Sequence, residues 1–581
     1  MILAVINGIN VSVDDGATIL EAAAQAQVKI PALCKHPDLP PTAGCGICVV
    51  KIAGRGGMVR ACCTPLEEGM DITTNDAELA DIRRTVVKLF LSNHPDECLY
   101  CGRNGTCELQ TMAAQFGIRH DNYPELVPDL PKDKSTGSIV LEPRKCIKCG
   151  RCIEVCQNMQ DVWALSFVDR GFDTRIAAAG EIDLADSPCI RCGQCSAHCP
   201  TGAIFEFDQT QEVWNALMNP DLRCVAQIAP AVRVSVGEAF GYEPGEIVTG
   251  QIYAALRRLG FDTVFDTNFG ADVTIMEEGT EFVQRFVHGA GTLPLITTCC
   301  PSWVDFMEKY HHDMIYNFSS CKSPHAILGA LTKTWYARQA KIPPEKIFMV
   351  SIMPCTSKKY EITRSDEMFA SGQQDVDVSI TTRELSRMIR QAGIDFDSLA
   401  AEDADNPLGE YTGAATIFGQ TGGVMEAALR TAHYLITGEE LAELEFNEIR
   451  GLKGVKEMEV EVAGKTVRIA VAHGCANVEQ VMDKIRAARD ANAELPYHFV
   501  EVMACPGGCV GGGGQSWGVT DEIRKKRAAA LTADDRSKDK RCSHQNESVQ
   551  KIYDDFIGKP LGEKAHELFH TRYKPRPQYR R

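Results

Sequence analysis

Three short cysteine motifs, each after a run of apolar residues, constrain the fold of this chain more than any other feature. They are Thr297-Thr-Cys-Cys-Pro-Ser-Trp303, Met353-Pro-Cys-Thr-Ser-Lys-Lys359 and Met503-Ala-Cys-Pro-Gly-Gly-Cys509. Such apolar runs favour buried strands, and sites in open α/β sheets form at the carboxyl ends of strands. Four motif thiols are therefore expected to converge on one metal cluster. They are Cys300, Cys355, Cys505 and Cys509.

In order and in sequence, the three motifs resemble the signature motifs of the iron-only, or FeFe, hydrogenases, and the resemblance covers nearly the whole chain. It implies that the four thiols hold a 4Fe-4S cube. Cys509 would bridge to a two-iron subsite that carries carbonyl, cyanide and dithiolate ligands, and the whole group would form the H-cluster. Cys299 would stay unligated as the proton donor. A lone cysteine is instead most often a small buried hydrophobic residue. That is the expectation for Cys224, Cys321, Cys475 and Cys542.

The resemblance also implies which side chains surround the two-iron subsite. Lys358 would place a positive charge against a cyanide ligand, because a buried ammonium needs an anionic partner. The glycines after Cys509 would let the backbone approach a bulky cofactor where a Cβ would clash. Further residues of the wall would be Ala229, Pro230, Met353 and Met503. The chain departs from the common family pattern close to the subsite, which leaves catalytic bias and oxygen sensitivity open. The departures are Ser302, Ala231 and His325.

A group of charged residues upstream of the first motif has the spacing of one helical face. Glu278, Glu281 and Arg285 lie three and four residues apart, so their side chains can meet. Without the resemblance, a solvated face with an ion pair would be the simpler interpretation. The resemblance implies a proton route in which Ser319 links the two glutamates on the way to Cys299. A free thiol beside a metal can have its pKa drawn toward neutrality, which suits such a route.

The size and composition of the chain set limits on its organisation. With 581 residues, about three to five domains are expected. The 25 cysteines follow no signal peptide, so they are expected to be metal ligands in a reducing cytoplasm rather than disulfides. The net charge of −17 argues against nucleic-acid binding. No apolar run approaches the roughly 20 residues that would span a membrane.

Residues 1–78 carry the first group of cysteines, with 10, 2 and 13 residues between them. The spacing resembles a plant-type 2Fe-2S ferredoxin of β-grasp fold, in the variant found in hydrogenases and respiratory complex I. A zinc site is the alternative. Cys63 could compete with its neighbour, but the following Thr-Pro favours Cys62. The expected ligands are Cys34, Cys45, Cys48 and Cys62. A helix is expected over residues 18–27, capped by Asp14, Asp15 or Thr18.

A helix is expected over residues 78–92. Residues 79–121, which include most of this helix, resemble the His-ligated 4Fe-4S segment of the same two families. The expected ligands are His94, Cys98, Cys101 and Cys107. On its own, His94 would be an ordinary histidine at a helix end. As a neutral ligand among thiolates, it would give this cluster a different reduction potential from that of its neighbours.

Residues 139–209 contain a repeated Cys-x2-Cys-x2-Cys-x3-Cys pattern, which is typical of bacterial two-cluster ferredoxins. In that pattern the fourth cysteine of each repeat binds the other cluster. One expected ligand set is Cys146, Cys149, Cys152 and Cys199, and the other is Cys189, Cys192, Cys195 and Cys156. Such crossing would hold the two halves together.

From about 210 to 520, apolar runs alternate with longer helical patterns, which indicates α/β layers and, with the three motifs, a catalytic hydrogenase domain. Strands are expected at 223–228, 263–265, 293–297, 347–352, 376–380, 467–472 and 498–502. Residues 541–581 resemble the separate small subunit of some periplasmic FeFe hydrogenases, here fused as a helical belt. The histidines of His566-Glu-Leu-Phe-His-Thr-Arg-Tyr573 are expected to pack or cap.

The whole chain is thus expected to be a multidomain α+β and α/β hydrogenase of the cytoplasm of an anaerobe. The accessory clusters would form a wire between the H-cluster and an outside donor. No flavin or nicotinamide site is visible, so NAD(P)H would need a flavin-containing partner subunit, in a hetero-oligomer that can bifurcate electrons. Ferredoxin alone is the other possible partner. Two rival functions are a non-catalytic electron-transfer subunit, as in complex I, and an iron–sulfur assembly or sensing protein. Neither needs Cys299 with three complete motifs.

Overall fold

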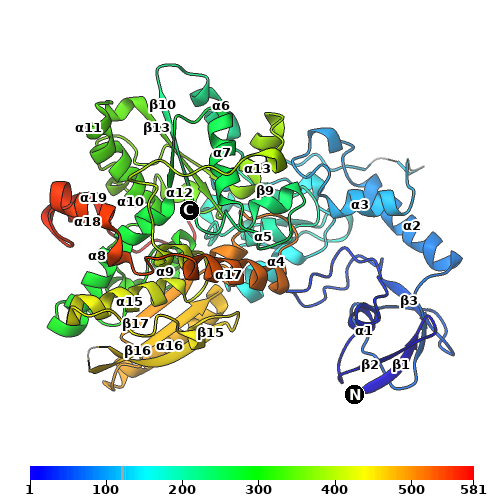
Figure 1. Cartoon of the computed structure of the whole chain (residues 1–581). Coiled ribbons are helices and arrows are strands. Elements are labelled where there is room, and N and C mark those ends of the chain that lie inside the picture. The colour runs from blue at the N-terminus through cyan, green and yellow to red at the C-terminus, as the bar shows by residue number, and fades with distance from the viewer. Residues whose placement is uncertain (120–122, 125, 463, 581) are drawn as a thin grey trace.

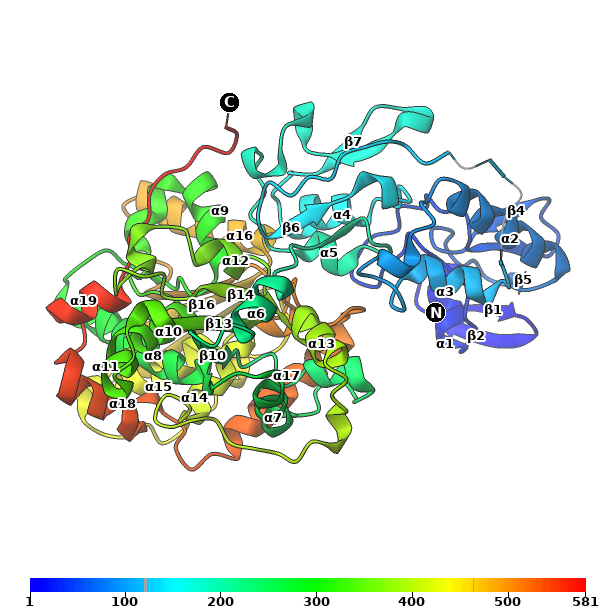
Figure 2. The same cartoon turned by 90° about the horizontal axis from the view of Figure 1, so that it is seen from above.

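The fold was analysed in a computed structural model, which describes residues 1–119, 123–124, 126–462 and 464–580. Figures 1 and 2 show a large body, drawn green to orange, with smaller units to one side of it. The blue N-terminal unit lies farthest out, and the cyan unit of residues 139–209 lies between it and the body. The red C-terminal helices lie on the opposite side of the body from the N-terminal unit.

The N-terminal unit is built on a five-stranded mixed sheet in the order β2-β1-β5-β3-β4. Helix α1 is capped by Thr18, whose side chain accepts a hydrogen bond from the Glu21 backbone N–H, while the Glu21 carboxylate accepts one from the Thr18 backbone N–H. Thr18 is therefore the correct choice among the three expected caps. The elements are β1 (Ile2–Ile6), β2 (Ile9–Val13), α1 (Ile19–Gln25), β3 (Val49–Ile52), β4 (Met58–Arg60) and β5 (Asp71–Thr73).

The connecting and cyan units contain little regular structure, because their chain is occupied by cysteine loops. Helix α2 (Ala77–Ser92) confirms the expected helix and is capped by Asp76. It is followed by α3 (Glu108–Gln115). The elements of the cyan unit are β6 (Ile139–Leu141), α4 (Arg151–Glu154), β7 (Ser166–Val168), β8 (Arg175–Ala177), α5 (Gln194–His198) and β9 (Ile204–Glu206). Its strands form two short antiparallel pairs, β6 with β9 and β7 with β8.

The large body contains two four-stranded sheets rather than one. The first is fully parallel, in the order β11-β10-β13-β14, and the second has the order β12-β17-β16-β15 with β15 antiparallel. The strands are β10 (Arg223–Ile228), β11 (Thr263–Asp266), β12 (Leu295–Ile296), β13 (Ile347–Met353), β14 (Val378–Thr381), β15 (Val455–Val462), β16 (Lys465–His473) and β17 (Phe499–Met503).

All seven expected strands occur, and most of them have bounds that differ by one or two residues from the expected ones. The largest difference is at 293–297, where the strand is only the two-residue β12; its ladder pairs with β17, and Ile296 adds one isolated bridge to Phe318. The one expected at 376–380 begins later, at Val378. Strand β15 was not predicted. Its sequence alternates apolar and charged residues, as befits an edge strand with one face exposed to solvent.

Long helices cover and separate the two sheets. The 22-residue helix α8 (Thr267–His288) follows β11 directly and packs against α10 (Pro324–Leu331) and α15 (Gly423–Thr437). The other α-helices of the described chain after the cyan unit are α6 (Thr210–Leu217), α7 (Thr249–Leu259), α9 (Pro301–Tyr310), α11 (Ala337–Ala340), α12 (Lys358–Glu361), α13 (Thr382–Gln391), α14 (Gly413–Thr416), α16 (Cys475–Asp490), α17 (Asp521–Arg536), α18 (Glu547–Ile552) and α19 (Glu563–Phe569).

One continuous apolar core joins the cyan unit to the body. Ile190 and Leu165 of the cyan unit belong to the same buried cluster as Trp303 on α9 and Val478 on α16. The N-terminal unit, in contrast, has a separate core of its own. Among the described residues, no helix is long and apolar enough to cross a membrane.

Candidate metal centres and proton route

The three cysteine motifs meet at one cavity between the two sheets. Cys300 follows β12 and begins α9, Cys355 follows β13, and Cys505 follows β17. Because β13 belongs to the other sheet, the site lies between two sheets and not at the edge of one. Of the residues predicted from sequence, those that line this cavity are Ala229, Pro230, Cys299, Cys300, Met353, Cys355, Lys358, Met503, Cys505 and Cys509.

The four converging thiols form a donor set that fits an iron–sulfur cluster. None of them is in a disulfide. Burial raises the pKa of Cys355 and of Cys509 to about 12, and each thiol also feels the charge of Cys300. Such a group would repel itself as free thiolates, whereas iron takes thiolates readily and compensates their charge. The protein surroundings therefore suit a bound cluster.

The glycine run after Cys509 packs backbone against backbone. A Cβ added at Gly512 would lie 2.1 Å from the Pro354 carbonyl oxygen, and one at Gly513 would lie 2.2 Å from that of Cys192. These glycines were expected to make room for the cofactor itself. Gly512 does line the cavity, and the closest contacts of the run are with the Cys355 motif and with the cyan unit, so the run also sets how closely the cysteine loops approach each other.

Lys358 is held at the cavity by a partner that the sequence interpretation missed. Its Nζ donates to the Cys299 carbonyl at 3.1 Å and to Glu361 Oε2 at 2.7 Å. Although burial disfavours its charge, the Glu361 carboxylate keeps the pKa of Lys358 above its ordinary value. The i,i+3 spacing of Lys358 and Glu361 on one helix was the signal that could have found this pair.

His325 is the departure from the family pattern that lines the cavity itself. Its Nε2 lies 2.7 Å from the same Glu361 oxygen, and its Nδ1 lies 3.2 Å from Ser351 Oγ. Burial and the Lys358 ammonium lower the pKa of His325 to about 4, so this imidazole is neutral near pH 7. Ala231 and Ser302 are also buried, each one residue beyond a lining proline.

The predicted proton-route residues form one buried chain of polar groups. Glu278 is 2% exposed, and burial raises its pKa to about 8 despite a hydrogen bond with Ser319. Ser319 Oγ donates to Glu281 Oε2 at 3.1 Å, and Arg285 donates to Glu281 Oε1 at 2.5 Å. Burial and the neighbouring Glu278 carboxylate raise the pKa of Cys299, so these surroundings favour the protonated thiol. The structure thus brings together all five residues and does not place them on a solvated face.

The cyan unit brings the repeated cysteines together in the crossed sets. Burial raises the pKa of Cys152, and Cys149, Cys146 and Cys199 lie close enough for their charges to raise it further. Burial and the charges of Cys189 and Cys156 raise the pKa of Cys195 in the same way. A second cavity is lined by Cys156, Cys189, Cys192 and Cys195.

The two N-terminal groups are likewise assembled from loops. Cys34, Cys45, Cys48 and Cys62 are all buried, and Cys62 has Cys48 and Cys34 as neighbours, whereas the competing Cys63 is exposed. His94, Cys98, Cys101 and Cys107 line a third cavity. Burial and Lys145 lower the pKa of His94 to about 4, and within the described chain its buried Nδ1 has no hydrogen-bond partner. A neutral imidazole with an unpaired buried nitrogen fits a metal ligand.

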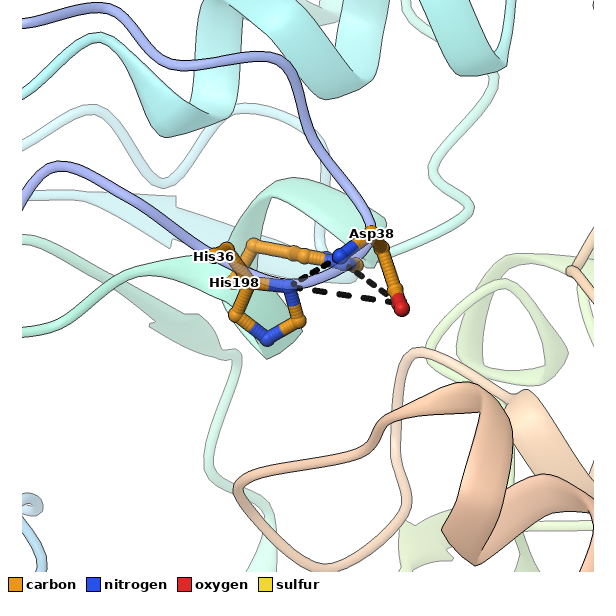
Figure 3. A group of neighbouring side chains, drawn as sticks. All are labelled: His36, Asp38 and His198. Carbon is orange, nitrogen blue, oxygen red and sulfur yellow. Dashed lines mark hydrogen bonds and ion pairs between the residues drawn. The ribbon is translucent and has the colours of Figure 1, made fainter. Parts of the chain in front are cut away.

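Three side chains at the junction of these units, those of His36, Asp38 and His198, lie close together and resemble a metal site (Figure 3). Asp38 Oδ2 lies 3.4 Å from His198 Nε2 and 4.0 Å from His36 Nδ1, and the two rings are 4.5 Å apart. Arg524 on α17 donates to the same Asp38 oxygen at 2.5 Å. A metal ion would have to displace this guanidinium, so the group is an ion-paired junction between three parts of the chain.

Comparisons with known proteins match every part of this arrangement. Residues 222–513 match the family described as iron only hydrogenase large subunit, C-terminal domain, and 521–576 match iron hydrogenase small subunit. Residues 1–77 match a 2Fe-2S iron-sulfur cluster binding domain, and 145–203 a 4Fe-4S dicluster domain. Residues 83–122 match the NADH-ubiquinone oxidoreductase-G iron-sulfur binding region.

Individual relatives extend over the full chain. The NADP-reducing hydrogenase subunit HndD of Solidesulfovibrio fructosivorans is 46% identical over 99% of both chains. Iron hydrogenase 1 of Clostridium pasteurianum is 41% identical over 98% of this chain and 99% of its own. A solved structure of FeFe-hydrogenase HydA1 from Chlamydomonas reinhardtii is 41% identical, with a TM-score of 0.56, over 63% of this chain and 99% of its own. The chain therefore belongs to the iron-only, or FeFe, hydrogenase family and carries accessory iron–sulfur domains ahead of its hydrogenase domain.

Proposed function

We propose that this hydrogenase interconverts dihydrogen with two protons and two electrons, at an H-cluster held by Cys300, Cys355, Cys505 and Cys509. When bound, the cluster supplies the iron site at which dihydrogen is split or formed and the electrons are stored. The chain itself excludes water, moves the proton and positions the cluster. The observation that carries the proposal is the chain of hydrogen-bonded, largely buried proton carriers that ends at the cysteine cavity.

Protons are proposed to pass along that buried chain in either direction. During dihydrogen formation, Glu278 delivers a proton to Cys299 Sγ and is reprotonated from Glu281 through the Ser319 hydroxyl. A carboxyl whose pKa of about 8 lies close to neutral pH can both give and take a proton, so Glu278 suits a relay. Arg285 orients Glu281 at the outer end through their hydrogen bond.

The remaining cavity residues are proposed to bind and enclose the cluster. Lys358 would present its ammonium to an anionic ligand, and its attachment to Glu361 and to the Cys299 carbonyl fixes where that charge lies. The apolar wall keeps water from the reacting atoms, which strengthens every charge interaction inside. That wall comprises Ala229, Pro230, Met353 and Met503.

Electrons are proposed to reach the cavity through one 2Fe-2S and three 4Fe-4S clusters, held by the ligands predicted above in the units 1–78, 79–121 and 139–209. The loops of neighbouring groups touch. Thr42, in the β-grasp-like first unit, donates to the Cys149 carbonyl at 2.8 Å, and a Cβ at Gly202 would lie 2.5 Å from Cys101 Sγ. Burial raises the pKa of Cys192, and Cys505 of the cavity lies close enough for its charge to raise it further. These contacts support two entry branches that join before the cavity.

The outer branch offers a surface for a redox partner. Leu99 and Tyr100 are 85% and 91% exposed, and they directly follow Cys98, a proposed ligand. Exposed apolar side chains beside a cluster favour a docking protein. Because the relative from S. fructosivorans is named as an NADP-reducing hydrogenase subunit, we propose a hetero-oligomer with NAD(P)H-oxidoreductase subunits. Ferredoxin would be a second partner, either alone or in an electron-bifurcating complex.

The test is dihydrogen evolution from reduced methyl viologen by the anaerobically matured chain, compared with Cys299→Ala. We expect activity in the parent and a loss of at least about 100-fold in the variant, because the variant lacks the last proton carrier. The infrared bands of bound carbonyl and cyanide should be the same in both. Full activity in the variant would remove Cys299 from the route. An inactive parent with those bands present would overturn the proposed reaction.

A further inference from the structure

The outer end of the proton route opens into a surface hollow of about 820 Å³. Glu281 and Arg285 reach it from α8. The C-terminal segment, where sequence alone suggested only packing histidines, supplies part of the opposite wall. The residues that this segment contributes are Lys559, Pro560, Leu561 and His566.

The C-terminal segment is tied to the route by His570 and by backbone hydrogen bonds. His570 Nδ1 lies 2.8 Å from Ser320 Oγ, and its Nε2 lies 3.1 Å from Glu277 Oε2. The Thr571 backbone N–H donates to the Ser320 carbonyl at 2.8 Å. Ser320 is itself joined to Glu281, because its backbone N–H donates to Glu281 Oε2 at 3.2 Å. Helix α19, which immediately precedes His570, is thereby held at the mouth of the route.

His566 on α19 has the properties of a proton-exchanging group. Its side chain is exposed, and its ring lies 4.3 Å from that of His570. Its ring nitrogens form no hydrogen bond within the part of the chain that the structure describes. Burial of part of the ring and the neighbouring His570 lower the pKa of His566, while Glu277 and Glu281 act against this shift. Lys559 and Arg285 are the cations that share the hollow with it.

We propose that His566 is the group through which Glu281 exchanges protons with solvent. His566 takes a proton from water or buffer and passes it across the hollow to the Glu281 carboxylate during dihydrogen formation. The direction reverses during dihydrogen oxidation, and no electron moves in either step. His570 is a positioning residue, because both of its ring nitrogens are engaged with Ser320 and Glu277. The inference rests on the proposed function of the buried route.

The test compares His566→Gln with the parent chain in weakly buffered solution. His288→Gln is a matched control, because His288 is an exposed histidine on α8 that does not line the hollow. We expect His566→Gln to lose at least about fivefold in turnover and to recover when free imidazole is added, as is usual for a lost general acid–base group. Equal turnover in His566→Gln and the parent, or a loss that imidazole does not restore, would overturn the inference.

A second measurement does not depend on a loaded active site. In chain labelled with carbon-13 histidine, the His566 signal is the one absent from His566→Gln. Its pKa should fall in Glu281→Gln, because that substitution removes a nearby negative charge. An unchanged pKa would contradict the proposed contact. Glu281→Gln also separates the two proposals. If it leaves dihydrogen evolution intact, the buried route fails, whereas if it abolishes evolution while His566→Gln does not reduce it, only the role of His566 fails.

Discussion

At the scale of single residues, the site depends on a few charges held in an apolar interior. Glu278 keeps its proton near neutral pH because burial disfavours its carboxylate, and Lys358 keeps its charge because Glu361 lies beside it. Desolvation thus raises the pKa of the Glu278 carboxyl, whereas at Lys358 desolvation is outweighed by the ion pair with Glu361, which raises the pKa of the ammonium. A small change in either neighbour should alter function before it alters the fold.

The raised pKa of Glu278 gives a stability prediction. The carboxyl ionises near 4.5 when unperturbed and near 8 in the folded chain, so the folded chain binds an extra proton between these pH values. The free energy of unfolding therefore falls as pH rises through this window. Glu278→Gln removes that loss, so its melting temperature should exceed the parent's by more at about pH 8.5 than at about pH 5.5. Thermal unfolding of cluster-loaded protein measures this.

The same variant should lose about 100-fold in dihydrogen evolution, because an amide cannot relay the proton. Glu281→Gln is the control for stability. It breaks the buried pair with Arg285, so it should lower the melting temperature at both pH values. A Glu278→Gln gain that does not depend on pH would show that the carboxyl is not the titrating group.

Sequence alone could identify most of the residues that meet at the candidate metal centres, because the spacing of cysteines along the chain is set by the geometry of the clusters that they bind. It could not identify the contact of His325 with Glu361, the contacts of His570 or the Asp38 junction. The spacing of Lys358 and Glu361 could have revealed that pair, but His325 meets Glu361 only in the fold. Asp38 meets Arg524 across most of the length of the chain. A pattern of spacing carries no information about partners so far apart.

At the scale of elements, loops that follow strands do the positioning. Strands β12, β13 and β17 end at the cavity, and each is followed by a cysteine motif that forms a turn or the start of a helix. The strands could be predicted because apolar runs indicate buried strands. The division of these strands into two sheets could not be predicted from the apolar runs. Strand order depends on pairing between distant segments, and β15 escaped notice because its exposed face is charged.

Gly512 tests the positioning by loops. In Gly512→Ala, the new Cβ would meet the Pro354 carbonyl oxygen and push the Cys509 loop away from Cys355. We expect the purified chain to lose about six irons, the four of the cube and the two of the attached subsite, while the accessory clusters remain. Iron analysis and electron paramagnetic resonance measure both quantities. Gly56→Ala, where no atom lies within 4 Å of the added Cβ, should keep its full iron content.

At the scale of the whole molecule, two kinds of attachment hold the units together. The N-terminal unit has its own core and meets the rest through a small apolar cluster, which includes Leu33, Val87 and Ile147, and through polar contacts such as those of Asp38 with His198 and Arg524. The cyan unit shares a much larger apolar core with the body. The outer part of the electron path should therefore loosen before the inner part.

Asp38→Ala should loosen the outer attachment alone. Losing the carboxylate leaves the buried Arg524 guanidinium without this partner, which costs more than a surface ion pair. Amide hydrogen exchange should quicken in the loop around Cys34 and in α17, with no change in β13 or α8. Arg55→Ala, which breaks only the surface pair with Glu67, should leave exchange in both segments unchanged. Equal protection in Asp38→Ala and the parent would show that other contacts carry the junction.

The shared apolar core between the cyan unit and the body also determines where this chain can be cut. A shortened protein that begins near residue 210 would lack Ile190 and Leu165 and so expose part of the apolar cluster that these residues share with Trp303 on α9 and Val478 on α16. Such a surface promotes self-association. Removing the N-terminal unit would uncover only the smaller apolar cluster that includes Val87 and Ile147, whereas a soluble minimal enzyme would need new polar side chains on α9 and α16.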